Sequence, residues 1–148
     1  MKKVILVGTI IIVALLNIAC SKTTEEIVVE APDYISETWV YYEQMNNTID
    51  SIEDGENIKI AFEKHFSTES ELKMYIDNAD MSRSSSEQQA VIENLYLMYL
   101  KLTTMAIENI NASMGGSSVD VERYLYELQV PQYELEKIYE EYGLKNDE

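Results

Sequence analysis

The sequence is poor in the residues on which many kinds of active site depend. Its 148 residues include one Cys and one His. A single Cys leaves no partner for an intramolecular disulfide, and this content excludes Cys-rich and multi-His zinc sites. Two Pro and five Gly argue against a fibrous or low-complexity chain. The length fits one domain, and we expect no cofactor and no metal ion.

Basic residues are also scarce. The chain carries 11 Lys and Arg against 27 Asp and Glu, a formal charge of −16. Nucleic-acid binding draws on clustered Lys and Arg, so a nucleic acid is excluded as a partner. The sequence contains no Gly-rich phosphate loop and no nucleophile elbow. His65 has Glu69 four residues further on as a possible catalytic partner. A partly buried or surface histidine at a helix end is the preferred interpretation. We therefore predict that the chain is not an enzyme.

The first twenty residues have the pattern of a targeting signal. A basic start at 1–3 is followed by an uncharged, apolar stretch at 4–16. This stretch is shorter than the roughly 20 residues that a membrane-spanning helix needs, and is typical of a secretory signal peptide. The segment Asn17-Ile18-Ala19-Cys20 then resembles the lipobox of bacterial lipoproteins. It departs from that family at Asn17, where Leu is usual.

The resemblance implies that Cys20 is lipidated and becomes the first mature residue. Residues 1–19 would then be the lipoprotein signal peptide, and 20–32 the lipidated Cys and a flexible tether, with a reach of about 40 Å. The chain would be lipid-anchored in the bacterial cell envelope. Ser21, in place of an Asp, favours the outer membrane in a cell that has one, facing the periplasm or the surface. The mature chain would carry 9 basic against 27 acidic residues.

After the tether, apolar residues recur at helical spacings. Between Ile35 and Ile52 they are separated by 4, 3, 3, 4 and 3 residues, which is one stripe of a helix. We predict an all-α, compact bundle of five or six helices as an acidic domain over 33–144, with a disordered tail at 145–148. The expected helices are 33–52, 58–66, one capped by Thr68 with Glu71, 86–112, one capped by Ser118, and one begun by Pro131; a loop is expected at 77–85.

The segment 95–100, with the sequence LYLMYL, is apolar or aromatic on every side. We predict that it lies in a central helix that is buried on most sides. A six-residue strand is the competing interpretation, and the helical period on both sides argues against it.

Tyrosine is unusually common, with 11 Tyr against two Phe. Tyr is enriched at interfaces because its ring is apolar while its hydroxyl stays hydrated. Three tyrosines fall off the inward stripes and lie among acidic residues. The alternative is that such rings cover the rims of a small core. We predict a partner-binding surface that includes Tyr41, Tyr126, Tyr133, Glu122, Glu127 and Glu134, with a basic protein as the partner.

These features lead to three functional hypotheses. The first is a membrane-tethered, non-enzymatic envelope lipoprotein that binds another protein, as an inhibitor or immunity protein against a basic toxin or enzyme. The second is a structural or exclusion lipoprotein that self-assembles or masks an envelope receptor. The third is a small hydrolase that uses carboxylates. Acidic residues around Gly55 leave weak calcium binding open, although their spacing does not match a calcium loop.

Overall fold

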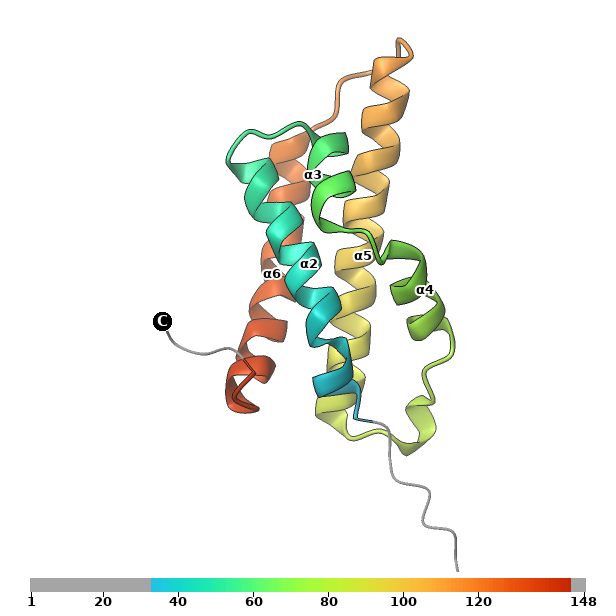
Figure 1. Cartoon of the computed structure of the whole chain (residues 1–148), viewed down its shortest axis with the longest axis vertical. Helices are drawn as coiled ribbons and strands as arrows, with labels where there is room; N and C mark the ends of the chain where they lie inside the picture. Colours follow the sequence, from blue (N-terminus) through green and yellow to red (C-terminus); the bar gives the residue numbers. More distant parts are fainter. Residues whose placement is uncertain (1–32, 145–148) are drawn as a thin grey trace, which may run out of the picture. The chain divides into compact units, whose positions relative to one another are not determined.

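A computed structural model describes residues 33–144, and this part of the chain is all-α (Figure 1). It contains five α-helices, one 3₁₀ turn and no strand, which confirms the predicted fold class. The signal peptide, Cys20, the tether and the tail lie outside the described residues. The elements are α2 Tyr34–Glu53, α3 Ile58–His65, α4 Glu69–Asp77, the turn η1 Met81–Arg83, α5 Ser86–Ser113 and α6 Val121–Glu141.

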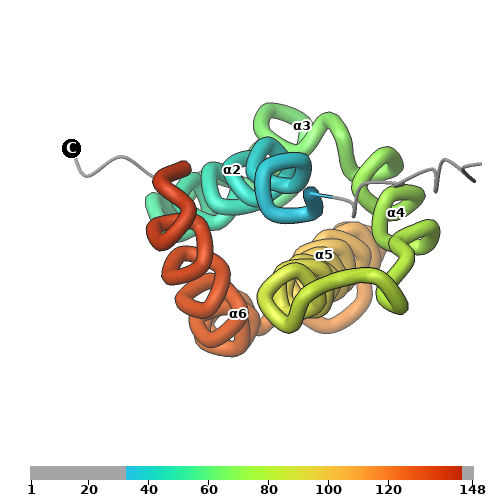
Figure 2. Tube along the Cα trace, turned by 90° about the horizontal axis from the view of Figure 1, so that it is seen from below, coloured from blue at the N-terminus to red at the C-terminus, as the bar shows by residue number. Residues whose placement is uncertain are grey.

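Three long helices form the frame of this domain. Figure 2 shows α2, α5 and α6 at the corners of a triangle, with α3 and α4 on the side away from α6. α5 contacts each of the other four helices, and α2 also packs against α3 and α6. None of the described helices is long and apolar enough to cross a membrane.

The core of the domain is built on one stripe of α5. Five side chains at spacings of 4, 3, 4 and 3 have no exposed surface. These spacings keep the side chains on one side of a helix with 3.6 residues per turn. The facing helices contribute stripes of the same kind, including Ile35, Met45 and Ile49 from α2 and Leu128 and Leu135 from α6. The stripe of α5 is Val91, Leu95, Met98, Leu102 and Met105.

The segment 95–100 is helical as predicted, but the prediction that it is buried on most sides is wrong. Tyr96, Leu97 and Leu100 are 44%, 46% and 38% exposed. The neighbours of α5 cover one side of it, because α3 and α4 are too short to surround a helix of 28 residues. The outward side of this segment therefore remains in solvent.

The two helices predicted after Ser118 are one helix, α6, and Pro131 lies inside it. Proline lacks the N–H that would bond to the carbonyl of Glu127, which normally breaks or kinks a helix. Here the buried positions of α6 continue through Pro131 at spacings of 4, 3, 4 and 3, so packing keeps the helix continuous. The helix begins at Asp120 rather than Ser118: the Asp120 side chain accepts a hydrogen bond of 3.1 Å from the Arg123 N–H.

The predicted capping box of α4 is also wrong. Thr68 is the N-cap residue but makes no side-chain cap. Its hydroxyl instead donates to Gln44 Oε1 at 2.8 Å and ties the start of α4 to α2. A capping box that sequence reasoning missed, between Ser85 and Gln88, begins α5.

The two sides of the segment 95–100 allow a stability test. Leu95→Ala should lower the free energy of unfolding by about 2–5 kcal/mol, because it opens a cavity in the core. Leu97→Ala on the same turn should change it by less than about 0.5 kcal/mol, since its side chain is half in solvent. Urea denaturation followed by circular dichroism measures both. Equal losses for the two variants would contradict the one-sided packing of α5.

Candidate binding surface

The surface of the described domain is strongly acidic. Residues 33–144 contain 22 Asp and Glu against seven Lys and Arg. Five of the seven basic side chains form ion pairs with carboxylates of the same chain. Most basic side chains are thus paired with carboxylates of the same chain, and the excess charge that faces solvent is negative.

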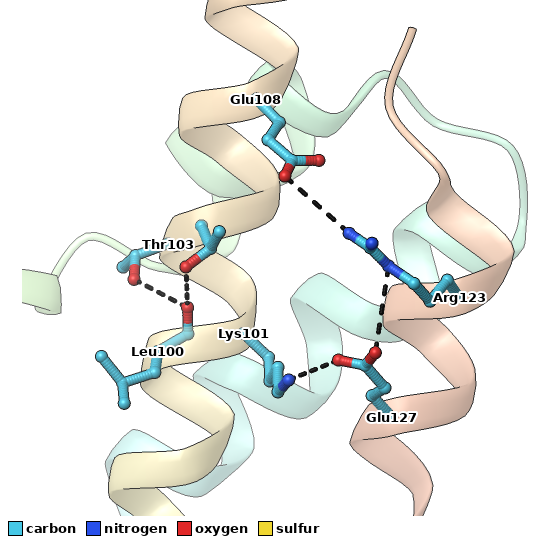
Figure 3. A network of polar contacts seen from close by, with 7 residues as sticks. Leu100, Lys101, Thr103, Glu108, Arg123 and Glu127 are labelled. Carbon is cyan, nitrogen blue, oxygen red and sulfur yellow. Dashed lines mark hydrogen bonds and ion pairs between the residues drawn. The ribbon is translucent and has the colours of Figure 1, made fainter.

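The largest of these ion-pair networks crosses the seam between α5 and α6 (Figure 3). The Arg123 guanidinium lies 3.8 Å from Glu108 Oε1 and 3.9 Å from Glu127 Oε1, and Lys101 pairs with the other oxygen of Glu127. Arg123 also lies over the ring of Tyr124, 4.6 Å from its centroid. Glu127, one of the predicted partner-binding residues, is therefore engaged with two basic groups of its own chain.

The outer face of α6 brings together three of the predicted residues. Glu122, Tyr126 and Tyr133 lie on the side of α6 opposite its buried stripe, because their spacing of four and seven residues keeps them on one helix face. Tyr126, Val130 and Tyr133 are 73%, 68% and 63% exposed. We call the apolar strip formed by Tyr126, Val130 and Tyr133 the α6 outer face. Lys137 follows one turn after Tyr133.

The remaining predicted residues lie differently. Glu134 is exposed and follows Tyr133 directly. Tyr41 is half-buried on α2, and its ring centroid lies 5.8 Å from that of Tyr75 on α4. Tyr41 therefore covers a rim of the core, as the alternative interpretation of the tyrosines supposes, and does not join the α6 outer face.

Sequence reasoning missed a small polar hollow between α2 and α6. Its volume is about 150 Å³. Five of its lining residues lie on one face of α2 at spacings of three and four, and α6 contributes a single carboxylate. Trp39 and Tyr42 belong to the predicted inward stripe of α2. That they also line a hollow depends on the register of α6 against α2, which the sequence alone does not give. The lining residues are Trp39, Tyr42, Glu43, Asn46, Asn47 and Glu136.

The hydroxyl of Tyr42 is the unusual group in this hollow. The residue is 2% exposed, and its hydroxyl is buried without a hydrogen-bond partner of normal geometry. The pKa of Tyr42 is raised far above its ordinary value, first by burial and then by the nearby Glu136 carboxylate. By contrast, the buried hydroxyl of Tyr139 shares a hydrogen bond of 2.9 Å with Thr38.

Acidic groups crowd the same edge of α2 and α6. Burial raises the pKa of Asp50, and the charges of Asp54 and Glu136 add to the rise. The amide of Asn46 is satisfied within the protein, because it donates to Asp50 and accepts from Gln132. This edge holds carboxylates whose mutual repulsion a positive group would relieve.

His65 and Ser51 form a hydrogen bond of 2.9 Å that links α3 to α2. A catalytic histidine also needs a group that orients its ring. Glu69, the neighbour in sequence, accepts a hydrogen bond of 2.9 Å from the Tyr99 hydroxyl instead. Burial, with the help of Glu69, raises the pKa of Tyr99 to about 12. Glu69 therefore serves to hold α4 on α5.

Within residues 33–144, no three His, Cys, Asp or Glu side chains converge in a way that could hold a metal ion. Comparison of the chain with protein-family models, with curated proteins and with solved structures finds no match in any of the three.

Tyr42→Phe should change the free energy of unfolding at neutral pH by less than about 1 kcal/mol, because the cost of burying the hydroxyl and its interaction with Glu136 offset each other. Above pH 10 the variant should become more stable than the wild type. The folded state holds Tyr42 neutral, whereas tyrosines of the unfolded chain ionise near pH 10, so the wild type loses stability as the pH rises. Urea denaturation at neutral and at alkaline pH measures both effects. A clear loss of stability at neutral pH would reveal a hydrogen bond at this hydroxyl.

Proposed function

We propose that the chain is a lipid-anchored, non-enzymatic protein of the bacterial cell envelope that binds a basic protein. In this proposal the lipidated Cys20 holds it at the membrane, and the acidic domain captures its partner. An inhibitor or immunity protein against a basic toxin or enzyme is the concrete form. The α6 outer face is the observation that carries the proposal.

Two physical properties support a protein partner for this face. Tyr126, Val130 and Tyr133 place large apolar groups in solvent, and buried Tyr side chains are among the strongest contributors to protein interfaces. The surrounding domain has 22 acidic against seven basic residues. A potential of one sign steers oppositely charged proteins toward it and disfavours acidic ones.

The outward side of the segment 95–100 supports a second candidate, a structural lipoprotein that self-assembles. Tyr96, Leu97 and Leu100 are partly exposed there and could meet a second copy. Two copies of an acidic domain repel each other, so this association should strengthen as salt is added, opposite to the capture of a basic partner.

The proposal is tested with the full chain in a non-ionic detergent, immobilised and exposed to envelope and secreted proteins. We expect a basic protein to be retained at about 0.05 M salt and to elute before about 0.5 M, since exposed charges are screened at that concentration. Retention of acidic proteins only, or of nothing, would reject the proposal.

Replacing Tyr126 and Tyr133 together by Ser should weaken binding of the retained protein by about tenfold or more, as expected for interface tyrosines. Tyr96→Ser, an exposed tyrosine on α5, is the matched control and should leave binding unchanged. Surface plasmon resonance with the purified partner measures all three proteins. If the control loses as much affinity as the double variant, the interface lies elsewhere.

A further inference from the structure

The outward side of α5 carries a second stripe of residues, separate from the buried one. Six positions along the helix and its C-cap, at spacings of 3, 4, 3, 4 and 3 residues, are all exposed. This is the spacing of a heptad seam, in which two positions of every seven face a partner helix. We call these residues the outer stripe of α5: Leu97, Leu100, Thr104, Ile107, Asn111 and Met114.

The outer stripe carries no charge, although the domain around it is strongly acidic. Lys101 and Glu108 are the only charged residues between Leu97 and Met114. Both belong to the ion-pair network with α6 that Figure 3 shows. A helix face that only meets solvent would share the acidic character of the rest of the surface. Contiguous apolar surface with little charge is typical of protein interfaces instead.

The exposed apolar surface is large enough for a pair of chains. Figure 1 shows the C-terminal end of α5 rising beyond the helices beside it, so the described helices leave the stripe open there. Six large apolar side chains on and beside the stripe are between 38% and 73% exposed. At roughly 200 Å² for each residue when fully exposed, they offer about 600 Å² per copy, or about 1,200 Å² in a pair, which is the lower limit of stable interfaces. These side chains are Tyr96, Leu97, Leu100, Ile107, Ile110 and Met114.

The outer stripe suits a second copy of itself, because it offers no carboxylate to a basic partner. We propose that two chains dimerise through their outer stripes, with the two α5 helices antiparallel. Each position of one stripe then meets a position of the other, which gives six layers of the kind found in coiled coils. The facing residues are Leu97 with Met114, Leu100 with Asn111, and Thr104 with Ile107.

The charges beside the stripe favour the antiparallel direction. Lys101 and Glu108 are seven residues apart and so lie along the same edge of the stripe. In an antiparallel pair these edges meet, and Lys101 of each copy faces Glu108 of the other. In a parallel pair this edge would meet the opposite one, where Tyr96, Thr103 and Ile110 carry no charge. The antiparallel pair also sets the two helix dipoles in opposite directions, which is favourable.

Cysteine cross-linking tests the register of the dimer. Leu100→Cys and Asn111→Cys are made separately in full chains that also carry Cys20→Ser, in non-ionic detergent. A mixture of the two should form a disulfide-linked dimer on mild oxidation, because the two positions share a layer. Either variant alone should not, since the two copies of one residue lie about 16 Å apart along the helix axis. Electrophoresis without reductant measures the product.

The strength of the dimer is measured by sedimentation equilibrium of the full chain in density-matched detergent. We expect a dissociation constant on the order of 10 µM, as befits a small interface. It should fall several-fold between about 0.05 M and 0.5 M salt, because screening reduces the repulsion between two acidic domains. Ile107→Glu should weaken the dimer by about tenfold or more, since it brings a charge into an apolar contact. Ile60→Glu adds the same charge at a 52% exposed isoleucine on α3 and should have little effect.

The proposal is overturned if the mixture gives no cross-link, if either cysteine variant cross-links with itself, or if the two Glu variants weaken the dimer equally. It does not rest on the capture of a basic protein, because the outer stripe and the α6 outer face are on different helices. A chain that retains a basic protein but does not cross-link keeps the proposed function and loses the dimer. The reverse result rejects the proposed function and leaves a self-assembling protein with a defined interface.

Discussion

The structure depends on the burial of one stripe of α5. The side chains from Val91 to Met105 on this stripe are shielded from solvent completely, and every other described helix contacts α5. Helices as short as α3 and α4 are not stable alone in water, because the nucleation of a helix is costly. They persist by docking a few side chains, such as Ala61 and Leu72, against the long helices. Burial of each such side chain contributes about 1–3 kcal/mol, comparable to the cost of ordering one or two residues.

The fold class could be predicted from the sequence because the apolar period is a local property, and each long stripe survives in the structure. What failed depends on neighbours far away in sequence. The apolar composition of the segment 95–100 is compatible with burial on all sides. It does not show how many helices pack around the segment, and the neighbouring helices cover only one side of it. Pro131 is a helix breaker by local rules, yet the buried stripe on both of its sides keeps α6 continuous. Thr68 has a cap sequence, and a bond to Gln44 on another helix takes its hydroxyl.

The candidate surface was predictable to the extent that it follows one helix. The exposure of Tyr126 and Tyr133 follows from the period of α6, whereas Tyr41 differs because α4 brings Tyr75 against it. The polar hollow could not be predicted at all, since it needs the register between α2 and α6. Buried hydroxyls elsewhere have partners: Thr48 donates to the Gln44 carbonyl at 2.7 Å, and Thr38 bonds with Tyr139. In the described part of the chain, Tyr42 is the one buried side chain whose hydroxyl makes no hydrogen bond of normal geometry. It lies beside Glu136 and lines the hollow.

In the proposed function, the charge and the exposed tyrosines act at different ranges, so the first would set the rate of association and the second the rate of dissociation. The excess of acidic groups acts over about 8–10 Å at physiological salt and mainly raises the rate of encounter. In the proposed complex, contacts of Tyr126, Val130 and Tyr133 would form only when water is expelled, and they would slow dissociation. The ion pairs at the α5–α6 seam and on α3 and α4 place five basic groups beside carboxylates of the chain itself. The carboxylates at the α2–α6 edge repel one another, and a bound cation would relieve that repulsion. A basic partner should therefore stabilise the folded domain as it binds, because binding to the folded state alone shifts the unfolding equilibrium.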